Sequence, residues 1–279
     1  MCTMKKKFQM IGFALSVLWV TLPIVTVGAD NAASGKQKKE KTTESALGVK
    51  PVTGSWINLA YKDVRNKYTN PQSFDNMDPK LWEAKVRELS AMGIEYLVLM
   101  EVANEGKSYY PSQIMPWWYN KDKKSPVDAI LDEAAKHNMK IFMSSGWAKD
   151  QDDNLLDPAI KERQLRIMEE LASLYKNHKA FYGWYLPVED CLCPIFAEHA
   201  VQSVNTLSEK AEKLAPGKKT LISPYGIGLS EFDNPEYEKQ MQKLKVDIIA
   251  YQDEVGCVRD QFTLPRLKKN WQRLRDIHN

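Results

Sequence analysis

The sequence is poor in the residues that build metal centres and disulfide scaffolds. Its 279 residues include four histidines and four cysteines. The histidines are too far apart to have the spacing of metal ligands. The signatures of serine hydrolases (G-x-S-x-G), of P-loop proteins and of zinc peptidases (H-E-x-x-H) are also missing. We therefore predict neither a metal ion nor a cofactor, and carboxylates and aromatic side chains remain as the candidates for chemistry.

A strong charge of one sign is missing as well. The formal net charge is +3, and the three lysines among the first 29 residues account for all of it. Residues 51–279 carry a slight excess of acidic side chains. Nucleic-acid-binding domains need a basic surface, so we expect no nucleic-acid partner. With 43% hydrophobic and 27% charged residues, the composition is that of a soluble globular protein.

Long hydrophobic runs are absent except near the N-terminus. Three lysines precede an apolar stretch over residues 10–22, and Val27 and Ala29 are small residues at the −3 and −1 positions of a cleavage site. This order predicts a secretory signal peptide over residues 1–29, export to the periplasm or the extracellular space, and no membrane anchor after cleavage. The alternative is an uncleaved anchor, for which the run is short of the about 20 residues that a span needs.

Residues 30–50 have almost no large apolar side chains and are rich in Lys, Ser, Thr, Gly and Glu. Such a segment buries too little surface to offset its ordering entropy. We predict a disordered linker here, followed by one domain over residues 51–279.

Strand patterns alternate with helix patterns through this domain. Strands are expected over residues 55–60, 94–102, 140–144, 181–188, 220–223 and 246–251. Helices are expected from about residues 79, 126, 158, 197, 235 and 264. Asp, Ser or Asn followed by Pro marks four of these helix starts, because such residues cap a helix whose first position is proline. The alternation predicts βα units and parallel strands.

Two architectures fit this alternation. A doubly wound sheet usually has a glycine-rich turn after its first strand, and residues 60–63 contain no glycine. A TIM-type (β/α)8 barrel fits better, because aromatic and acidic residues gather at the strand ends, where barrel active sites form. We count six units, and the sequence ends within a helix pattern. We therefore expect a barrel truncated after about six units, without strands seven and eight; the alternatives are missed short strands or an open sheet.

Acidic residues follow three of the expected strands. Alternation places Tyr185 and Glu189 on one face of the fourth strand, so that Glu189 would lie at the barrel mouth. There, apolar neighbours would raise its pKa, as a general acid requires. By the same alternation, Tyr251 and Asp253 share one face at the end of the sixth strand, so Asp253 is the preferred second carboxylate, with Glu254 in reserve. Glu101 follows the second strand. Helix capping or loop solvation is the alternative role for each.

Aromatic and amide side chains surround these acids in the sequence. They could contact the apolar faces of a sugar, or could pack within loops. The candidate substrate-binding residues are Trp56, Asn58, Trp117, Trp118, Trp147, Tyr185, Tyr225 and Tyr251.

Three cysteines follow the signal segment. Export permits one disulfide, with Cys257 as a candidate partner of Cys191 or Cys193. Without a bridge, the Cys-x-Cys motif is either a weak metal signal or, as we favour, two small buried residues.

Three segments carry a family resemblance: Gly54–Ile57, Gly183–Glu189 and Ala250–Asp253. They resemble a bacterial domain-of-unknown-function family of exported TIM barrels, which is similar to glycoside hydrolases. Many glycosidase barrels have their acid/base glutamate at the end of strand four, and this position corresponds to Glu189. Their nucleophile commonly follows strand seven, which we do not find in this chain.

These observations give three hypotheses. The first is an exported glycoside hydrolase-like protein in which Glu189 protonates the leaving oxygen, while Asp253 or a residue missing from this chain is the nucleophile or base. The second is a barrel that binds carbohydrate without cleaving it. The third is an inactive, truncated fragment. The sequence does not identify the sugar, the linkage or the oligomeric state.

Overall fold

The computed structural model describes residues 51–59, 77–104, 106–146, 156–252 and 262–278. Thr53–Asn279 form one compact unit, which contains every helix and strand described below. The predicted signal peptide (1–29) and linker (30–50) lie outside the described residues. No helix within the described ranges is long and apolar enough to cross a bilayer.

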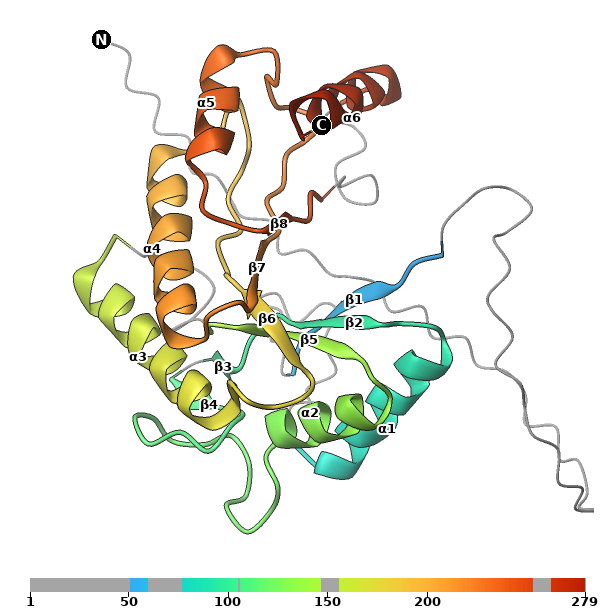
Figure 1. The fold of residues 1–279 in the computed structure, drawn as a ribbon, viewed down its shortest axis with the longest axis vertical. Helices are drawn as coiled ribbons and strands as arrows, with labels where there is room; N and C mark the ends of the chain where they lie inside the picture. Colours follow the sequence, from blue (N-terminus) through green and yellow to red (C-terminus); the bar gives the residue numbers. More distant parts are fainter. Residues whose placement is uncertain (1–50, 60–76, 105, 147–155, 253–261, 279) are drawn as a thin grey trace, which may run out of the picture. The chain divides into compact units, whose positions relative to one another are not determined.

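The described part of the chain contains one six-stranded parallel sheet (Figure 1). Its strands, in spatial order, are β1 (Gly54–Ile57), β2 (Tyr96–Leu99), β5 (Lys140–Ser144), β6 (Phe181–Tyr185), β7 (Lys219–Ile222) and β8 (Ile248–Ile249). Each new strand is added next to the preceding one. A doubly wound sheet reverses this order at its switch point, so that alternative is wrong. The fold is a curled partial barrel of the TIM type, as predicted.

Six helices alternate with these strands and cover one face of the sheet (Figure 1). They are α1 (Pro79–Ala91), α2 (Pro126–Lys136), α3 (Pro158–Tyr175), α4 (Glu198–Leu214), α5 (Pro235–Lys243) and α6 (Leu264–His278). The four predicted helix caps are confirmed. The side chains of Asp78, Ser125, Asp157 and Asn234 each accept a hydrogen bond from a backbone N–H of the first helical turn.

Some predictions of the local structure are wrong. Strands β2 and β8 are shorter than the apolar runs from which we predicted them, because those runs continue into the loops at the sheet edge. A small hairpin, β3 (Ala103–Asn104) and β4 (Lys107–Ser108), was not predicted, since two-residue strands are too short to show alternation.

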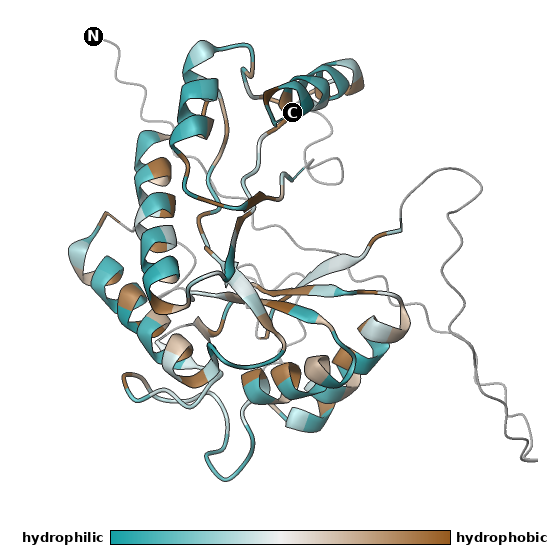
Figure 2. Cartoon of the chain, in the orientation of Figure 1, coloured by the Kyte–Doolittle hydropathy of each residue, from teal (hydrophilic) through white to brown (hydrophobic). Residues whose placement is uncertain are grey.

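The two faces of the sheet have separate apolar clusters. Leu97, Leu99, Met143 and Trp184 belong to the large core between sheet and helices. The alternate residues Val98, Phe142, Tyr185 and Leu221 form a second cluster on the opposite, inward face. Figure 2 shows that the helices are polar on the side turned away from the sheet. Both faces of the strands are therefore apolar, which explains their almost continuous hydrophobic sequences.

Gly183 permits the close approach of two strands. A Cβ atom at this position would lie 2.3 Å from the backbone oxygen of Lys219 and 2.8 Å from Cε1 of Phe142. The pairing of β5 with β6 is irregular at the same level, between Ile141 and Phe142. Glycine is therefore required where β6 bends into the inward cluster.

Candidate functional site

Polar residues follow the apolar inward cluster at the C-terminal ends of the strands. Alternation continues the inward face from Trp56 to Asn58 and from Leu221 to Ser223. The side-chain amide of Gln252, after β8, donates a hydrogen bond of 2.8 Å to the backbone oxygen of Ser223. In a barrel this is the end at which active sites form.

The side chains of Tyr185 and Glu189, four residues apart in the chain, are hydrogen-bonded to each other at this end of the barrel. The Tyr185 hydroxyl donates a hydrogen bond of 2.7 Å to Oε1 of Glu189. Tyr185 is fully buried in the inward cluster, so it holds the carboxylate above that cluster. The two side chains that we predicted on one face therefore meet in a hydrogen bond.

The surroundings of Glu189 favour its protonated form. The residue as a whole is exposed, but its carboxyl group lies among protein atoms next to the buried Tyr185 ring. This partial burial raises the pKa of Glu189, and the hydrogen bond from Tyr185 acts in the opposite direction with a smaller effect. Burial, and next the charge of Glu189, raise the pKa of Tyr185 well above its ordinary value. Tyr185 is thus a neutral hydrogen-bond donor at every physiological pH.

The other predicted carboxylates differ from Glu189. Glu101 follows β2 and is almost completely buried, with 1% of its surface exposed. Asp253 and Glu254 lie outside the described residues. Our preference for Asp253 assumed that the face of Tyr251 is the barrel mouth. The Tyr251 hydroxyl instead lies 3.2 Å from that of Tyr237 in α5 and 2.8 Å from Nε2 of His278 in α6. Tyr251 therefore faces the helices, and the reason for ranking Asp253 above Glu254 is lost.

Asn58 and Trp56 both lie on the inward face. Trp56 is partly buried and packs against the inward cluster. Oδ1 of Asn58 is buried and has no hydrogen-bond partner among the residues that the structure describes. A buried amide oxygen without a donor is unfavourable in the free protein, so Asn58 is suited to accept a hydrogen bond from a ligand.

Trp117 and Trp118 lie in the loop between β4 and α2, and other side chains of the protein pack against their rings. Trp117 stacks on Tyr119 with ring centroids 5.1 Å apart, and Trp118 stacks on Tyr109 at 6.2 Å. The ammonium group of Lys107 lies 4.4 Å from the Trp118 ring centre. These contacts support the loop-packing alternative for both tryptophans.

Glu170 of α3 anchors the same loop. Its carboxylate accepts hydrogen bonds from the Tyr110 hydroxyl (2.8 Å), the Ser112 hydroxyl (2.6 Å) and the backbone N–H of Gln113 (2.6 Å). This role of Glu170 was not predicted, because a surface glutamate in a helix gives no sign of a partner about sixty residues away.

Two further predicted residues can be placed only in part. Tyr225 follows β7 and forms an isolated parallel bridge with Cys191, which brings the loops after β6 and β7 together. Trp147 lies outside the described residues.

The cysteines differ from expectation. Cys191 and Cys193 form a disulfide with each other, not with Cys257, which lies outside the described residues. The Cys-x-Cys motif, which begins two residues after Glu189, was the available signal for this pairing. No group of three or more metal-ligating side chains occurs within the described ranges.

The partial barrel thus has a carboxylate, Glu189, in the loop that follows the fourth strand of its sheet. Residues 52–279 match the family described as a domain of unknown function, DUF4434, and the chain belongs to this family. This confirms the predicted kind of family. No curated protein matches the sequence.

Solved structures share the fold. A Bacteroides thetaiotaomicron VPI-5482 protein named “putative alpha-L-fucosidase” has a TM-score of 0.57 and 19% identity, with 80% of this chain and 70% of that chain covered. An intracellular xylanase of Thermoanaerobacterium saccharolyticum has a TM-score of 0.46 and 16% identity, with 72% and 68% covered. At 19% identity, the likeness to the Bacteroides protein shows the fold, a barrel distantly similar to glycoside hydrolases, and not the activity.

Proposed function

We propose that this protein is an exported glycoside hydrolase-like protein and that Glu189 is its general acid. The observation that carries the proposal is the position of Glu189 in the segment after β6, where it is hydrogen-bonded to Tyr185, the last residue of that strand, and has a raised pKa. A carboxyl group that keeps its proton at higher pH can donate it to a glycosidic oxygen.

The remaining parts of the reaction follow from carboxylate chemistry. Asp253, Glu254 and Glu101 are the candidates within the chain for nucleophile or base. Carboxyl groups about 5 to 5.5 Å apart would give retention, and about 6.5 to 9.5 Å would give inversion. No cofactor is required for either route.

The rim of the barrel supports carbohydrate as the ligand. Sugar hydroxyls can donate to the unpartnered Oδ1 of Asn58, and the polar strand ends offer further hydrogen bonds. The glycosidase name of the Bacteroides protein with the same fold agrees with this class of ligand.

The test is a hydrolysis and binding screen over oligosaccharides and aryl glycosides, with the full chain and two variants. Glu189→Gln removes the acidic proton, and Glu162→Gln makes the same chemical change at an exposed residue of α3. We expect hydrolysis to fall by roughly 10²–10⁴-fold in Glu189→Gln and to be unchanged in Glu162→Gln. Binding without hydrolysis, unchanged by Glu189→Gln, would identify a carbohydrate-binding barrel instead. The absence of both binding and hydrolysis would refute the proposal.

Export is tested separately. Expression with the native N-terminus should give a chain that begins at Asp30 in the periplasm or medium, as determined by N-terminal sequencing. A membrane-bound chain that retains residues 1–29 would show the uncleaved anchor.

A further inference from the structure

A disulfide lies next to the candidate acid and has no part in the proposed hydrolysis. Cys191 and Cys193 are bonded to each other, and Cys191 is two residues after Glu189. Both cysteines are partly exposed, so a reagent in solution can reach them. A bridge that closes so short a loop restricts the unfolded chain little, so a large contribution to stability does not explain it.

The disulfide is set tightly against the neighbouring loop. Cys191 bridges to Tyr225, and the backbone N–H of Leu192 donates a hydrogen bond of 2.8 Å to the Tyr225 oxygen. The next residue, Gly226, has a φ of 89°, and a Cβ atom there would lie 2.8 Å from Sγ of Cys191 and 2.9 Å from Sγ of Cys193. Both sulfur atoms therefore rest on the Gly226 backbone.

The two sulfur atoms are not equivalent. The backbone N–H of Cys193 donates a hydrogen bond of 3.3 Å to Sγ of Cys191. A donor at this sulfur stabilises a thiolate there, which makes Cys191 the better leaving group. Attack by an incoming thiolate is then directed to Sγ of Cys193.

We propose that Cys191 and Cys193 form a thiol–disulfide exchange site for a dithiol, either a small molecule or a dithiol protein. One thiolate of the dithiol attacks Sγ of Cys193, the S–S bond breaks, and Cys191 leaves as a thiolate. The second thiolate of the dithiol then attacks the mixed disulfide and releases Cys193. In total, the dithiol is oxidised to a disulfide, and two electrons and two protons pass to the cysteines.

Exchange at this site also acts on Glu189, and this part of the proposal rests on the proposed function. Reduction moves the sulfur atoms from bonding to van der Waals distance. Gly226 leaves no space on its side, so residues 190–193 must shift away from it. Glu189 precedes this segment directly, and its hydrogen bond with Tyr185 fixes it only from the other side. The Cys191–Cys193 disulfide is thus a positioning element for the candidate acid.

The exchange site can be tested without any substrate. Trypsin releases a peptide over residues 180–210, which contains Cys191 and Cys193 and no other cysteine. The native full chain, purified without reductant, is treated with N-ethylmaleimide and digested with trypsin. The mass of the peptide is then measured by mass spectrometry. We expect no N-ethylmaleimide on this peptide in the untreated chain. After reduction of the native chain with dithiothreitol, we expect two labels. After the reduced chain is then treated with the disulfide form of dithiothreitol, the peptide should again carry no label. Double labelling before reduction, or labelling only after denaturation, would overturn the proposal.

The direction of exchange is tested with a matched pair of variants, both in a Cys257→Ser background. Cys193→Ser leaves the Cys191 thiol, and Cys191→Ser leaves the Cys193 thiol. Iodoacetamide should alkylate Cys191 at a lower pH than Cys193. The reverse order would refute the assignment of Cys191 as the leaving group.

The effect on Glu189 is measured in the oxidised chain, the reduced chain and the Cys191→Ser/Cys193→Ser double variant. If the oxidised chain hydrolyses a glycoside, we expect a loss on the order of 10²-fold in the other two forms, as for a misplaced acid. If the oxidised and the reduced chain hydrolyse the glycoside at equal rates, although peptide labelling shows that the disulfide is fully reduced, the coupling to Glu189 is refuted. The proposed exchange site is not affected by that result. If no glycoside is cleaved, the coupling is measured by stability instead. The change in the free energy of unfolding caused by Glu189→Gln is determined once in the oxidised and once in the reduced chain. The same change in both redox states would refute the coupling.

Discussion

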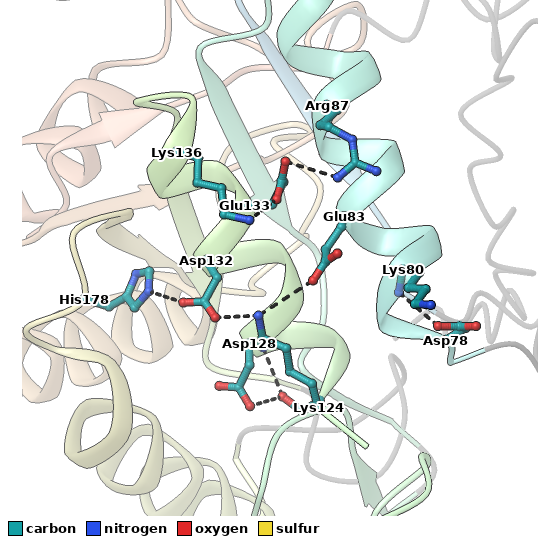
Figure 3. Close-up of polar contacts among 11 residues, drawn as sticks. Asp78, Lys80, Glu83, Arg87, Lys124, Asp128, Asp132, Glu133, Lys136 and His178 are labelled. Carbon is teal, nitrogen blue, oxygen red and sulfur yellow. Dashed lines mark hydrogen bonds and ion pairs between the residues drawn. The ribbon is translucent and has the colours of Figure 1, made fainter. Parts of the chain in front are cut away.

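The contact network around Glu133 predicts an acid-sensitive step in stability. Glu133 lies in α2, next to Lys136 and opposite Arg87 of α1 (Figure 3). Only 4% of its side chain is exposed. Its carboxylate is 2.7 Å from Nζ of Lys136, 3.2 Å from Nη1 of Arg87 in α1 and 3.2 Å from Nε2 of His137. The hydrogen bond from Lys136 is the largest influence on the Glu133 pKa; burial opposes it, and Arg87 and His137 add to it. Together they lower the pKa from 4.5 to about 2.

This shift sets the size and the sign of the effect. A full shift of this size would correspond to about 3 kcal/mol at 1.36 kcal/mol per pKa unit. Arg87 and Lys136 are half exposed or more, so solvent screening reduces the figure, and we expect about 1 to 2 kcal/mol. Because the folded-state pKa is lowered, the stabilisation is complete above about pH 4.5 and is lost as the pH falls toward about 2.

The assay is urea unfolding of the wild type and Glu133→Gln at about pH 7 and about pH 3. The variant should be less stable at neutral pH, and the difference should shrink at acidic pH. Glu88→Gln is the control. Glu88 pairs with Lys85 in α1 and its side chain is 63% exposed, so this substitution should change the stability little. A difference for Glu133→Gln that is the same at both pH values would refute the electrostatic explanation and indicate packing instead.

Three further predictions follow from single contacts. Glu189→Gln should raise the free energy of unfolding at neutral pH, because a raised carboxyl pKa penalises the folded state as the pH rises above about 4.5; below that pH, chemical denaturation should give equal stabilities. Gly183→Ala should unfold the domain or destabilise it by several kcal/mol in a urea melt, because its Cβ would lie 2.3 Å from the Lys219 oxygen, whereas Gly54→Ala, with its nearest contact at 3.7 Å, should be tolerated. Glu170→Ala should cost about 1 to 3 kcal/mol and increase proteolysis in the loop before α2, since three hydrogen bonds hold that loop; unchanged proteolysis would show that the loop is fixed without them.

The order of the elements could be predicted because local signals determine it. The four capped helix starts depend on a side chain and a proline within one turn, and all four are confirmed. Strand ends were less predictable, as for β2, because apolar residues continue past the last sheet hydrogen bonds into a buried loop. The hairpin of β3 and β4 has no periodic signal at all.

The site was predictable where strand alternation determines it. Alternation placed Tyr185 and Glu189 on one face, and the hydrogen bond between their side chains agrees with this although β6 itself ends at Tyr185. It misled us at Tyr251, which lies beyond a strand of only two residues and turns toward α5 and α6. The stacking of Trp117 and Trp118 on loop neighbours depends on tertiary packing, which no spacing in the sequence reveals.

The position of Glu189 connects its stability effect with its proposed chemistry. The Tyr185 ring that completes the inward cluster also brings the Glu189 carboxyl group among protein atoms, where the charged form is disfavoured. That penalty weakens the fold at neutral pH, and it is also what would allow the carboxyl group to retain a proton for donation. If Glu189 is the acid, Glu189→Gln must therefore be more stable and less active in the same preparation. A variant that loses activity without gaining stability would show that the partial burial of Glu189 is not the source of its reactivity.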